Sequence, residues 1–263
     1  MKIINVFCDA SIDTNKHIAC GGCYITIQEI VPEVRIVNGY RKDTVSSIYI
    51  KDYCSKMHIQ HNATNNSAEI LAIWTGIQEI IRIREMYPNA IYRVFSDSKI
   101  SLYGLRDWMK NWINRYDPEK GVLISSSGEE VANQQYFIEI YNLIIELGLK
   151  VEFYHQRGHV GESGGVSLIM ARTQFIKANK VPPEALGLSI EELVRCNHMI
   201  DNNTRAALKH YINSNGVLLD NTYEELIHPL RFYPKYDRLD DYIHNINKTS
   251  VVSRHDFKGG YNQ

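Results

Sequence analysis

The chain has 263 residues, of which 44% are hydrophobic and 22% are charged. This balance is typical of a globular protein that buries a core, and the length fits one elaborated domain with a small addition, so a fibrous repeat and two large domains are excluded. The net charge is −1, with 29 Lys and Arg against 30 Asp and Glu, so a polyanionic partner must be bound by a local basic patch.

The cysteine count and the apolar runs bear on the compartment. Five cysteines are an odd number and indicate no disulfide framework. The first residues, MKIINVFCDASID, lack the apolar core of a secretory signal, and the apolar runs are shorter than the roughly 20 residues of a membrane-spanning helix. We therefore expect a cytoplasmic monomer in a reducing environment, without a membrane segment.

The N-terminal half predicts strands followed by a long helix. Segments 2–8, 22–30 and 45–53 are β-branched or alternate in hydropathy and are expected to form strands. A helix is expected over 67–87, where apolar residues recur at helical spacing between the caps Asn65, Asn66 and Ser67 and the terminating Pro88.

The second half predicts alternating strands and helices. A strand is expected over 91–95 and another over 150–154, with helices over 101–114 and 129–147 between them. This alternation indicates the α/β class with a mixed sheet.

The remaining residues are less regular. Region 161–198 is interpreted as an insertion, with a short helix over 167–178 and a helix start at Ser189. A helix over 201–212 follows, and residues 213–263 are interpreted as a C-terminal extension of undefined role. We thus expect one domain over 1–212 that carries the insertion at about 161–198.

Three acids stand where strands end or a helix begins. Asp9 follows the first strand, Asp97 follows the fourth, and Glu69 lies near the start of the long helix. Ligand sites form at strand ends in open sheets, so these carboxylates are expected to share one pocket. Close carboxylates repel one another unless cations neutralise them, and oxygen ligands suit Mg²⁺ or Mn²⁺. The pattern indicates metal-assisted phosphodiester hydrolysis, with helix capping as the alternative for any single acid.

Several motifs, in this order along the chain, resemble those of ribonuclease H type 1, which cuts RNA in an RNA–DNA hybrid. FCDAS (7–11), ATNNSAEI (63–70) and FSDSKISLYGLRDWMKNWINR (95–115) resemble the segments that carry three acids in that family. EFYHQRGHVG (152–161) resembles its histidine loop, and IDNNTRAAL (200–208) resembles its closing helix with a fourth acid. The resemblance covers about residues 3–210.

The resemblance implies an RNase H-like fold, with a five-stranded mixed sheet in the order 3-2-1-4-5 flanked by helices. It implies two Mg²⁺ ions, for which Mn²⁺ can substitute, held by Asp9, Glu69, Asp97 and Asp201. It further implies that His159, rather than the nearby His155, shuttles a proton or assists product release. The products then carry 5′-phosphate and 3′-hydroxyl ends.

The resemblance also implies a set of substrate contacts. Asn65 and Asn66, with Asn15 nearby, are the candidates for contacting the 2′-hydroxyl that distinguishes RNA, and helix capping is their alternative role. Thr64 and Asn133 resemble a pocket for a phosphate of the DNA strand. The predicted nucleic-acid-binding residues are Asn15, Thr64, Asn65, Asn66, Lys99, Trp108, Trp112 and Asn133. For each of the two tryptophans, core packing is the alternative.

Some residues depart from the family pattern. Asn62 stands where some members have an Arg, Lys99 stands where others have a Gln, and segment 111–121 has nearly balanced charge where many members are basic. We expect an endoribonuclease that acts on RNA–DNA hybrids, such as replication primers or R-loops. Two alternatives stay open: an RNase H-like nuclease acting on DNA or structured RNA, and a catalytically silent module that binds nucleic acid or protein.

Two further features carry weaker hypotheses. Cys20, Cys23, Cys54, His58 and His61 have spacings that a zinc site uses, although small buried thiols are the simpler interpretation. Residues 228–248 mix aromatic and basic side chains, which indicates either an added nucleic-acid or partner surface or a tail that packs on its own domain.

Overall fold

The structure is a computed structural model that describes residues 1–37, 40–161, 166–218 and 222–226. Most of the C-terminal extension, including the aromatic and basic segment 228–248, lies outside these residues. Within them, no helix combines the length and the hydrophobicity needed to cross a membrane. The cytoplasmic location and the monomeric state stay predictions.

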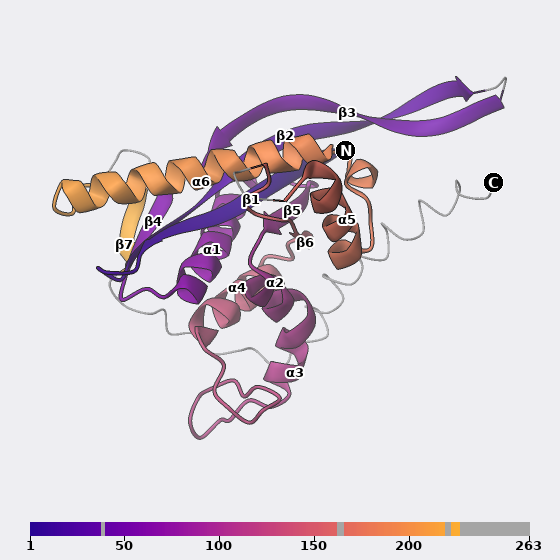
Figure 1. Ribbon diagram of the computed structural model, residues 1–263. Coiled ribbons are helices and arrows are strands. Elements are labelled where there is room, and N and C mark those ends of the chain that lie inside the picture. Colours follow the sequence, from indigo (N-terminus) through magenta and orange to yellow (C-terminus); the bar gives the residue numbers. More distant parts are fainter. Residues whose placement is uncertain (38–39, 162–165, 219–221, 227–263) are drawn as a thin grey trace.

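The described residues form a mixed sheet of seven strands (Figure 1). The strands are β1 (Lys2–Asp13), β2 (Ile18–Val37), β3 (Tyr40–Cys54), β4 (Met57–His61), β5 (Ile91–Ser96), β6 (Val151–His155) and β7 (Thr222–Leu226). β1 is antiparallel to β2 and parallel to β5, which is parallel to β6, and β3 pairs with β2. The strands that correspond to the five predicted ones follow the order β3-β2-β1-β5-β6, which is compatible with 3-2-1-4-5. The sheet differs in detail, because its main path is β6-β5-β1-β2-β4-β7 and β3 pairs with β2 off this path.

The prediction of five strands was too low. The chain breaks at Ser55, whose backbone N–H donates to the Cys23 carbonyl, and then resumes as β4, which pairs with the first residues of β2. β7, from the C-terminal extension, pairs with β4. The sheet therefore has two additional strands, β4 and β7, on the side of β2 where the sequence predicted only the third strand.

β2 and β3 are also longer than expected and form an arm that projects from the body of the molecule (Figure 1). Pairing of β1 with β2 ends at Glu29, whereas pairing of β2 with β3 continues to Val37 and Tyr40. Pro32 lies in this outer part, where β2 has a neighbour on one side only, so its missing N–H does not interrupt a central ladder.

The helices are α1 (Asn65–Ile83), α2 (Lys99–Tyr103), a π-helical turn (Gly104–Trp108), α3 (Met109–Ile113), α4 (Gln134–Glu146), α5 (Leu168–Asn179), a 3₁₀ turn (Pro183–Leu186) and α6 (Ile190–Asn213). The predicted helix 101–114 is wrong in its continuity, because it consists of three segments. A side chain at Gly104 would collide with the Phe137 ring, so the helices approach closely where the π turn begins.

Two other helix boundaries differ from expectation. α4 starts at Gln134 rather than at 129, because the preceding residues form a bridge between Ile124 and Glu130. α6 starts at Ile190, where Ser189 and Glu192 form a capping box, and continues without a break to Asn213. The last residues of the predicted insertion therefore belong to the same helix as 201–212.

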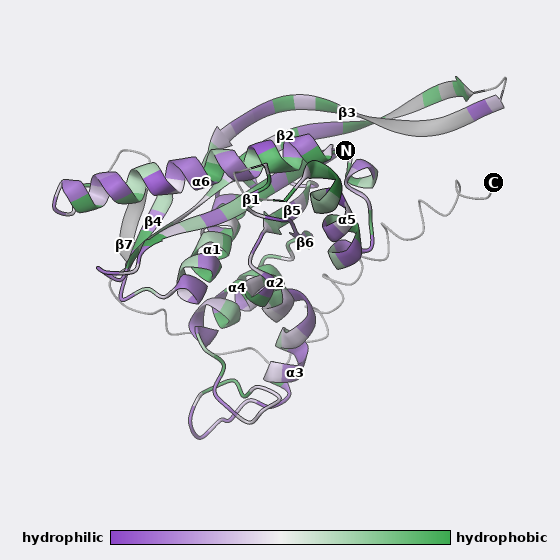
Figure 2. Ribbon diagram, viewed as in Figure 1, coloured by the Kyte–Doolittle hydropathy of each residue, from purple (hydrophilic) through white to green (hydrophobic). Residues whose placement is uncertain are grey.

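Two hydrophobic cores lie on opposite faces of the sheet. Alternate residues of β1 separate them: Val6 and Cys8 pack with α1 and α4, whereas Phe7 packs with α5 and α6. In Figure 2, α6 carries both hydrophilic and hydrophobic stretches, as expected for a helix that lies on a sheet. The insertion and α6 thus cover the face that α1 leaves free.

Candidate active site

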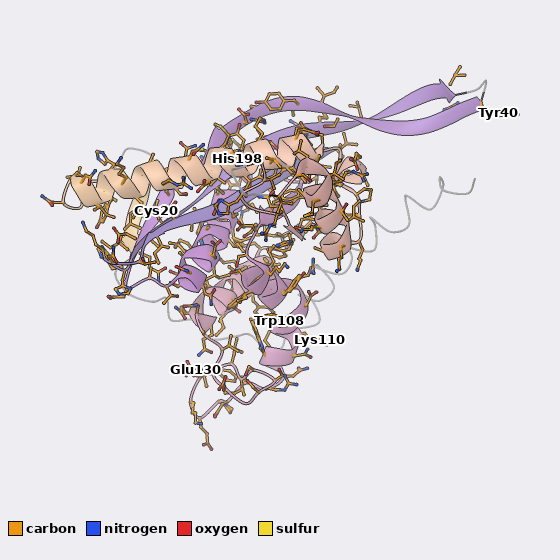
Figure 3. The ribbon with its side chains drawn as sticks, in the orientation of Figure 1. Cys20, Tyr40, Trp108, Lys110, Glu130 and His198 are labelled. Atoms are coloured by element: carbon orange, nitrogen blue, oxygen red, sulfur yellow. The ribbon has the colours of Figure 1, made fainter. Side chains whose placement is uncertain are left out.

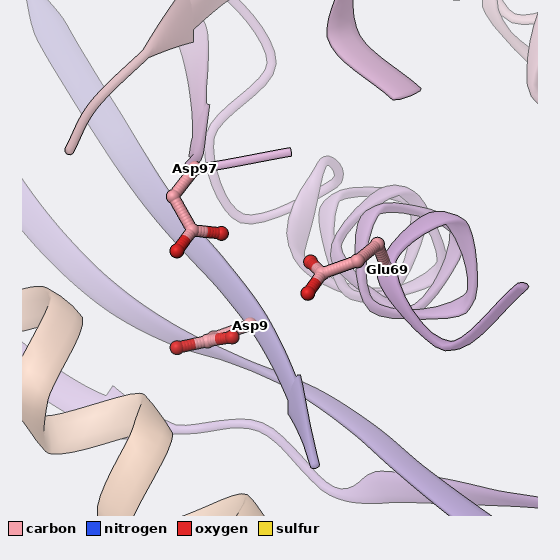
Figure 4. A group of neighbouring side chains, drawn as sticks. All are labelled: Asp9, Glu69 and Asp97. Atoms are coloured by element: carbon pink, nitrogen blue, oxygen red, sulfur yellow. The ribbon is translucent and has the colours of Figure 1, made fainter. Parts of the chain in front are cut away.

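Three carboxylates from distant parts of the chain meet at one point (Figure 4). One oxygen each of Asp9, Glu69 and Asp97 lies within 4.8 Å of the other two. Within the described residues, this is the only group of three or more His, Cys, Asp or Glu side chains close enough to share an ion. The expectation that these acids share one pocket agrees with this geometry.

The sheet register places two of these acids. β1 and β5 are parallel neighbours, with Phe7 opposite Phe95, so Asp9 and Asp97 follow two residues later at the same edge. The Phe7 and Phe95 rings stack with centroids 4.7 Å apart beneath them. Glu69 lies near the N-terminus of α1, which packs across the same strands.

Asp9 is buried and Glu69 and Asp97 are half-buried, and this loss of solvent contact governs their protonation. Burial, together with the charge of Asp97, raises the pKa of Asp9 to about 8. Burial and the charges of Asp97 and Asp9 raise the pKa of Glu69 to about 9. The pKa of Asp97 is raised by burial, and the positive charges of His159 and Arg157 oppose this rise.

The donor set fits a divalent cation. Oε2 of Glu69 is buried without a hydrogen-bond partner, and an orphaned carboxylate oxygen facing two other acids is the arrangement that a hard cation satisfies. All three donors are carboxylate oxygens, the ligands that Mg²⁺ and Mn²⁺ prefer.

A cavity of about 430 Å³ opens beside the acids. Asp9, Glu69 and Asp97 line it together with Asp201 and His159. Asp201 comes from α6 and forms an ion pair with Arg205 at 2.7 Å, so it faces the cavity without joining the close group of three.

His159 is placed at the rim of this cavity by a tight turn. It is exposed and has a φ of 53°, in the left-handed region. The preceding Gly158 packs directly on the Asp97 carboxylate, so a side chain at position 158 would collide with it. His155, in contrast, is buried, its Nε2 lies 3.1 Å from the backbone oxygen of Asp97, and burial lowers its pKa to about 4.

With this geometry established, comparison with known proteins is decisive. The sequence model of the RNase H family matches residues 1–167, which is more than half of the chain. The chain belongs to the RNase H family. The predicted family and its RNase H-like fold are thereby confirmed.

Individual relatives of this RNase H chain are distant. The ribonuclease H of Thermosynechococcus vestitus is 26% identical over 125 residues, which are 46% of this chain and 71% of that protein. LC9-RNase H1, a type 1 RNase H with the type 2 active-site motif, is 18% identical with a TM-score of 0.36, over 70% of this chain and 72% of that one. LC11-RNase H1 in complex with an RNA/DNA hybrid is 16% identical with a TM-score of 0.32, over 69% and 94% of the two chains.

None of the eight predicted nucleic-acid-binding residues lines the cavity. Asn65 and Asn66 are exposed at the start of α1, and Thr64 caps this helix by accepting a hydrogen bond from the Ser67 N–H. Asn15 is exposed in the turn after β1, where its N–H donates to Asp13 at 2.9 Å.

The other four of these residues lie on or next to the later helices. Lys99 is exposed at the start of α2, and Asn133 precedes α4 in the left-handed conformation. Trp108 is 39% exposed, whereas Trp112 is 8% exposed and its ring packs edge-on against the Phe137 ring, with centroids 5.1 Å apart. Figure 3 labels Trp108 close to Lys110. This placement favours core packing for Trp112 and leaves Trp108 as the accessible ring.

The sequence did not indicate Asn197 and His198, which line the cavity from α6. The sequence predicts a helix start at Ser189 and a separate helix over 201–212, so it does not place Asn197 and His198 on the helix face that carries Asp201. The signal was present: Asn197, Asp201 and Arg205 are spaced by four residues and share one helix face once α6 is continuous.

The zinc hypothesis is not supported by the fold. Cys20 packs in the core beneath α5 and α6, whereas Cys23 packs in the core beneath α1, on the opposite face of the sheet. His58 is buried, and its Nδ1 lies 2.9 Å from the Thr75 hydroxyl. The cysteines are therefore the small buried thiols of the simpler interpretation, with Cys54 half-buried.

Proposed function

We propose that this RNase H chain is an endoribonuclease that hydrolyses the RNA strand of RNA–DNA hybrids by two-metal-ion catalysis. Membership of the family indicates a nuclease-type hydrolase that acts on RNA. The convergence of Asp9, Glu69 and Asp97 in one cavity is the observation that supports this chemistry most strongly. Mg²⁺ is the proposed cofactor, with Mn²⁺ as its substitute.

In this mechanism Asp9, Glu69 and Asp97 hold the divalent ions. Asp201 faces the same cavity and supplies a fourth carboxylate. Divalent ions held by these carboxylates would supply Lewis-acid activation of water and would neutralise negative charge on the leaving 3′ oxygen. Asp9 is buried and Glu69 and Asp97 are half-buried, so their charges act on the reacting phosphate with less solvent screening than at an exposed surface, which strengthens each interaction.

The protein also moves protons and binds the hybrid. His159 is exposed and lines the cavity, and its imidazole is proposed to take or deliver a proton and to assist product release. Asn65 and Asn66 present exposed amides near Glu69 for the 2′-hydroxyl of the RNA strand. Thr64, Asn133, Lys99, Trp108 and Asn15 are proposed to contact the hybrid around the cavity.

The test is hydrolysis of matched labelled substrates: an RNA–DNA hybrid, duplex RNA and duplex DNA, each with Mg²⁺, Mn²⁺ or EDTA. We expect metal-dependent cleavage of the hybrid alone, with 5′-phosphate and 3′-hydroxyl ends. Asp97→Asn is expected to lower the rate at least about 100-fold, because it removes a charge aimed at the reacting centre. Asp107→Asn is the matched control, since Asp107 is a surface acid paired with Arg106.

Other outcomes distinguish the alternatives. Cleavage of duplex DNA or duplex RNA in preference to the hybrid would transfer the proposal to a different substrate. Binding of the hybrid without cleavage under Mg²⁺ and Mn²⁺ would identify a silent binding module instead.

A further inference from the structure

The insertion contains a helix, α5, that begins where the match to the family ends, at residue 167. Its last residue, Asn179, bonds to both backbone groups of His155 on β6. Oδ1 accepts from the His155 N–H at 2.9 Å, and Nδ2 donates to the His155 carbonyl at 2.7 Å. β6 is an edge strand, so Asn179 satisfies the two groups that a further strand would otherwise satisfy.

His155 in turn holds the end of β5, where Asp97 stands. Its side-chain Nε2 lies 3.1 Å from the backbone oxygen of Asp97. The next residue, Gln156, donates its backbone N–H to the Ser96 carbonyl at 3.0 Å. The chain then passes through Gly158, which packs on the Asp97 carboxylate, to His159. A displacement of the His155 backbone is therefore transmitted to Asp97.

A second contact ties α5 to the same strands. The rings of Phe175, Tyr154, Phe95 and Phe7 are stacked in that order, with centroids 6.3, 5.3 and 4.7 Å apart. Phe95 and Phe7 stand two residues before Asp97 and Asp9. The stack fixes α5 against β6, β5 and β1 directly beneath the acids, so Asn179 is held at a defined distance from the end of β6.

We propose that Asn179 is a positioning residue for the acidic group: by holding the backbone of His155, it fixes the main chain of Asp97 and the turn that carries His159. The proposal rests on the proposed function in one respect, the divalent ion assigned to the acids. Asn179 does not line the cavity, so it acts through His155 rather than on substrate. Its additional bond to the Phe175 carbonyl, 3.0 Å, gives the competing explanation that it merely ends α5.

The experiment compares Asn179→Leu and Asn179→Ser with the wild-type chain. Leu keeps the bulk of the side chain without its polar atoms, and Ser is too short to reach both backbone groups of His155. Thr173→Ala is the matched control, because Thr173 is exposed on α5 and its hydroxyl donates to the Ile169 carbonyl of the same helix. Mn²⁺ affinity is measured by electron paramagnetic resonance without substrate, together with the thermal midpoint and the hydrolysis of hybrid.

We expect both Asn179 variants to bind Mn²⁺ about tenfold more weakly, as when an outer partner of a metal ligand is removed. At saturating Mn²⁺, kcat for hybrid falls while KM stays within about twofold, because the variants leave the substrate-contacting surface intact. Thr173→Ala changes none of these values.

The proposal is overturned if both variants lower the thermal midpoint but bind Mn²⁺ as the wild-type chain does, because Asn179 then only fastens α5. It is also overturned if the wild-type chain binds no Mn²⁺. A wild-type chain that binds Mn²⁺ without cutting hybrid would refute the proposed function alone, and a weaker Mn²⁺ affinity of the variants would still support the positioning role.

Discussion

Packing three carboxylates together destabilises the metal-free protein, and this cost depends on pH. Asp9 has a pKa of 3.8 as an ordinary side chain and of about 8 in the fold. Between these values the folded chain retains a proton that the unfolded chain releases, so raising the pH favours unfolding. The stability contributed by the protonated Asp9 carboxyl is fully present below pH 3.8 and is lost as the pH rises through about 8. We therefore expect Asp9→Asn to stabilise the metal-free protein at alkaline pH.

The magnitude follows from the two pKa values. Their difference corresponds to about 6 kcal/mol of unfolding free energy at a pH above both, since one pKa unit is 1.36 kcal/mol. Asp9 is 7% exposed, so solvent screens this value little. The Ala10 N–H donates to Asp9 Oδ1 at 2.7 Å, and replacing that charged acceptor by an amide costs roughly 1–2 kcal/mol. The expected net gain at pH 8.5 is about 4 kcal/mol.

The assay is urea unfolding followed by circular dichroism at pH 5.5 and 8.5, with EDTA or with saturating Mn²⁺. The wild-type chain with EDTA is expected to be less stable at pH 8.5, and an ion at 100 times its Kd restores about 2.7 kcal/mol. Asp9→Asn loses both the pH dependence contributed by Asp9 and the response to the ion, whereas Asp107→Asn retains both. Equal stability of the metal-free wild-type chain at the two pH values, or a less stable Asp9→Asn at pH 8.5, would refute this reasoning.

Three further predictions test single positions. Gly158→Ala places a methyl group against the Asp97 carboxylate, so Mn²⁺ affinity in electron paramagnetic resonance should fall about tenfold or more; unchanged affinity contradicts the contact. Trp112→Ala should cost about 3–5 kcal/mol in urea unfolding, whereas Trp108→Ala should cost less than about 1 kcal/mol and weaken hybrid binding; the reverse order would disprove their placement. Thr64→Ala removes the cap of α1 and should cost about 1 kcal/mol in the same assay, and no change would show that the cap is dispensable.

The elements that the sequence predicted well are those with local signals. α1 has a capping box at one end, apolar residues at helical spacing and Pro88 beyond the other end, and each signal is readable without tertiary context. β5 and β6 are short and largely buried, and the first residues of β1 share this pattern. Asp97 directly follows β5, as the sequence indicated, whereas Asp9 lies inside β1, which continues to Asp13 rather than ending near residue 8.

The elements that were missed depend on contacts that the sequence does not display. Beyond Glu29, β2 pairs with β3 alone among the described residues, so no packing against the rest of the sheet indicates in the sequence how far these two strands extend. The interruption of the helix after residue 103 arises from the close approach of Gly104 to Phe137 on another helix. Neither feature has a local signature comparable to a cap or a Pro.

For predicting which residues line the cavity, the position where α6 starts matters more than the identity of Asp201 alone. The motif around Asp201 predicts that acid. A predicted insertion that ends at residue 198, however, divides α6 and separates Asn197 and His198 from the helix face that Asp201 occupies. The capping box at Ser189 already predicted a helix start, and no Pro or Gly lies between it and Asn213. A helix with a strong start and no breaker continues, so the cavity wall extends upstream of Asp201. The last residues of the predicted insertion, Asn197 and His198, therefore line the cavity, and Asn179 at the end of α5 bonds to the backbone of His155 on β6, so the predicted insertion contacts the acidic site at two separate points.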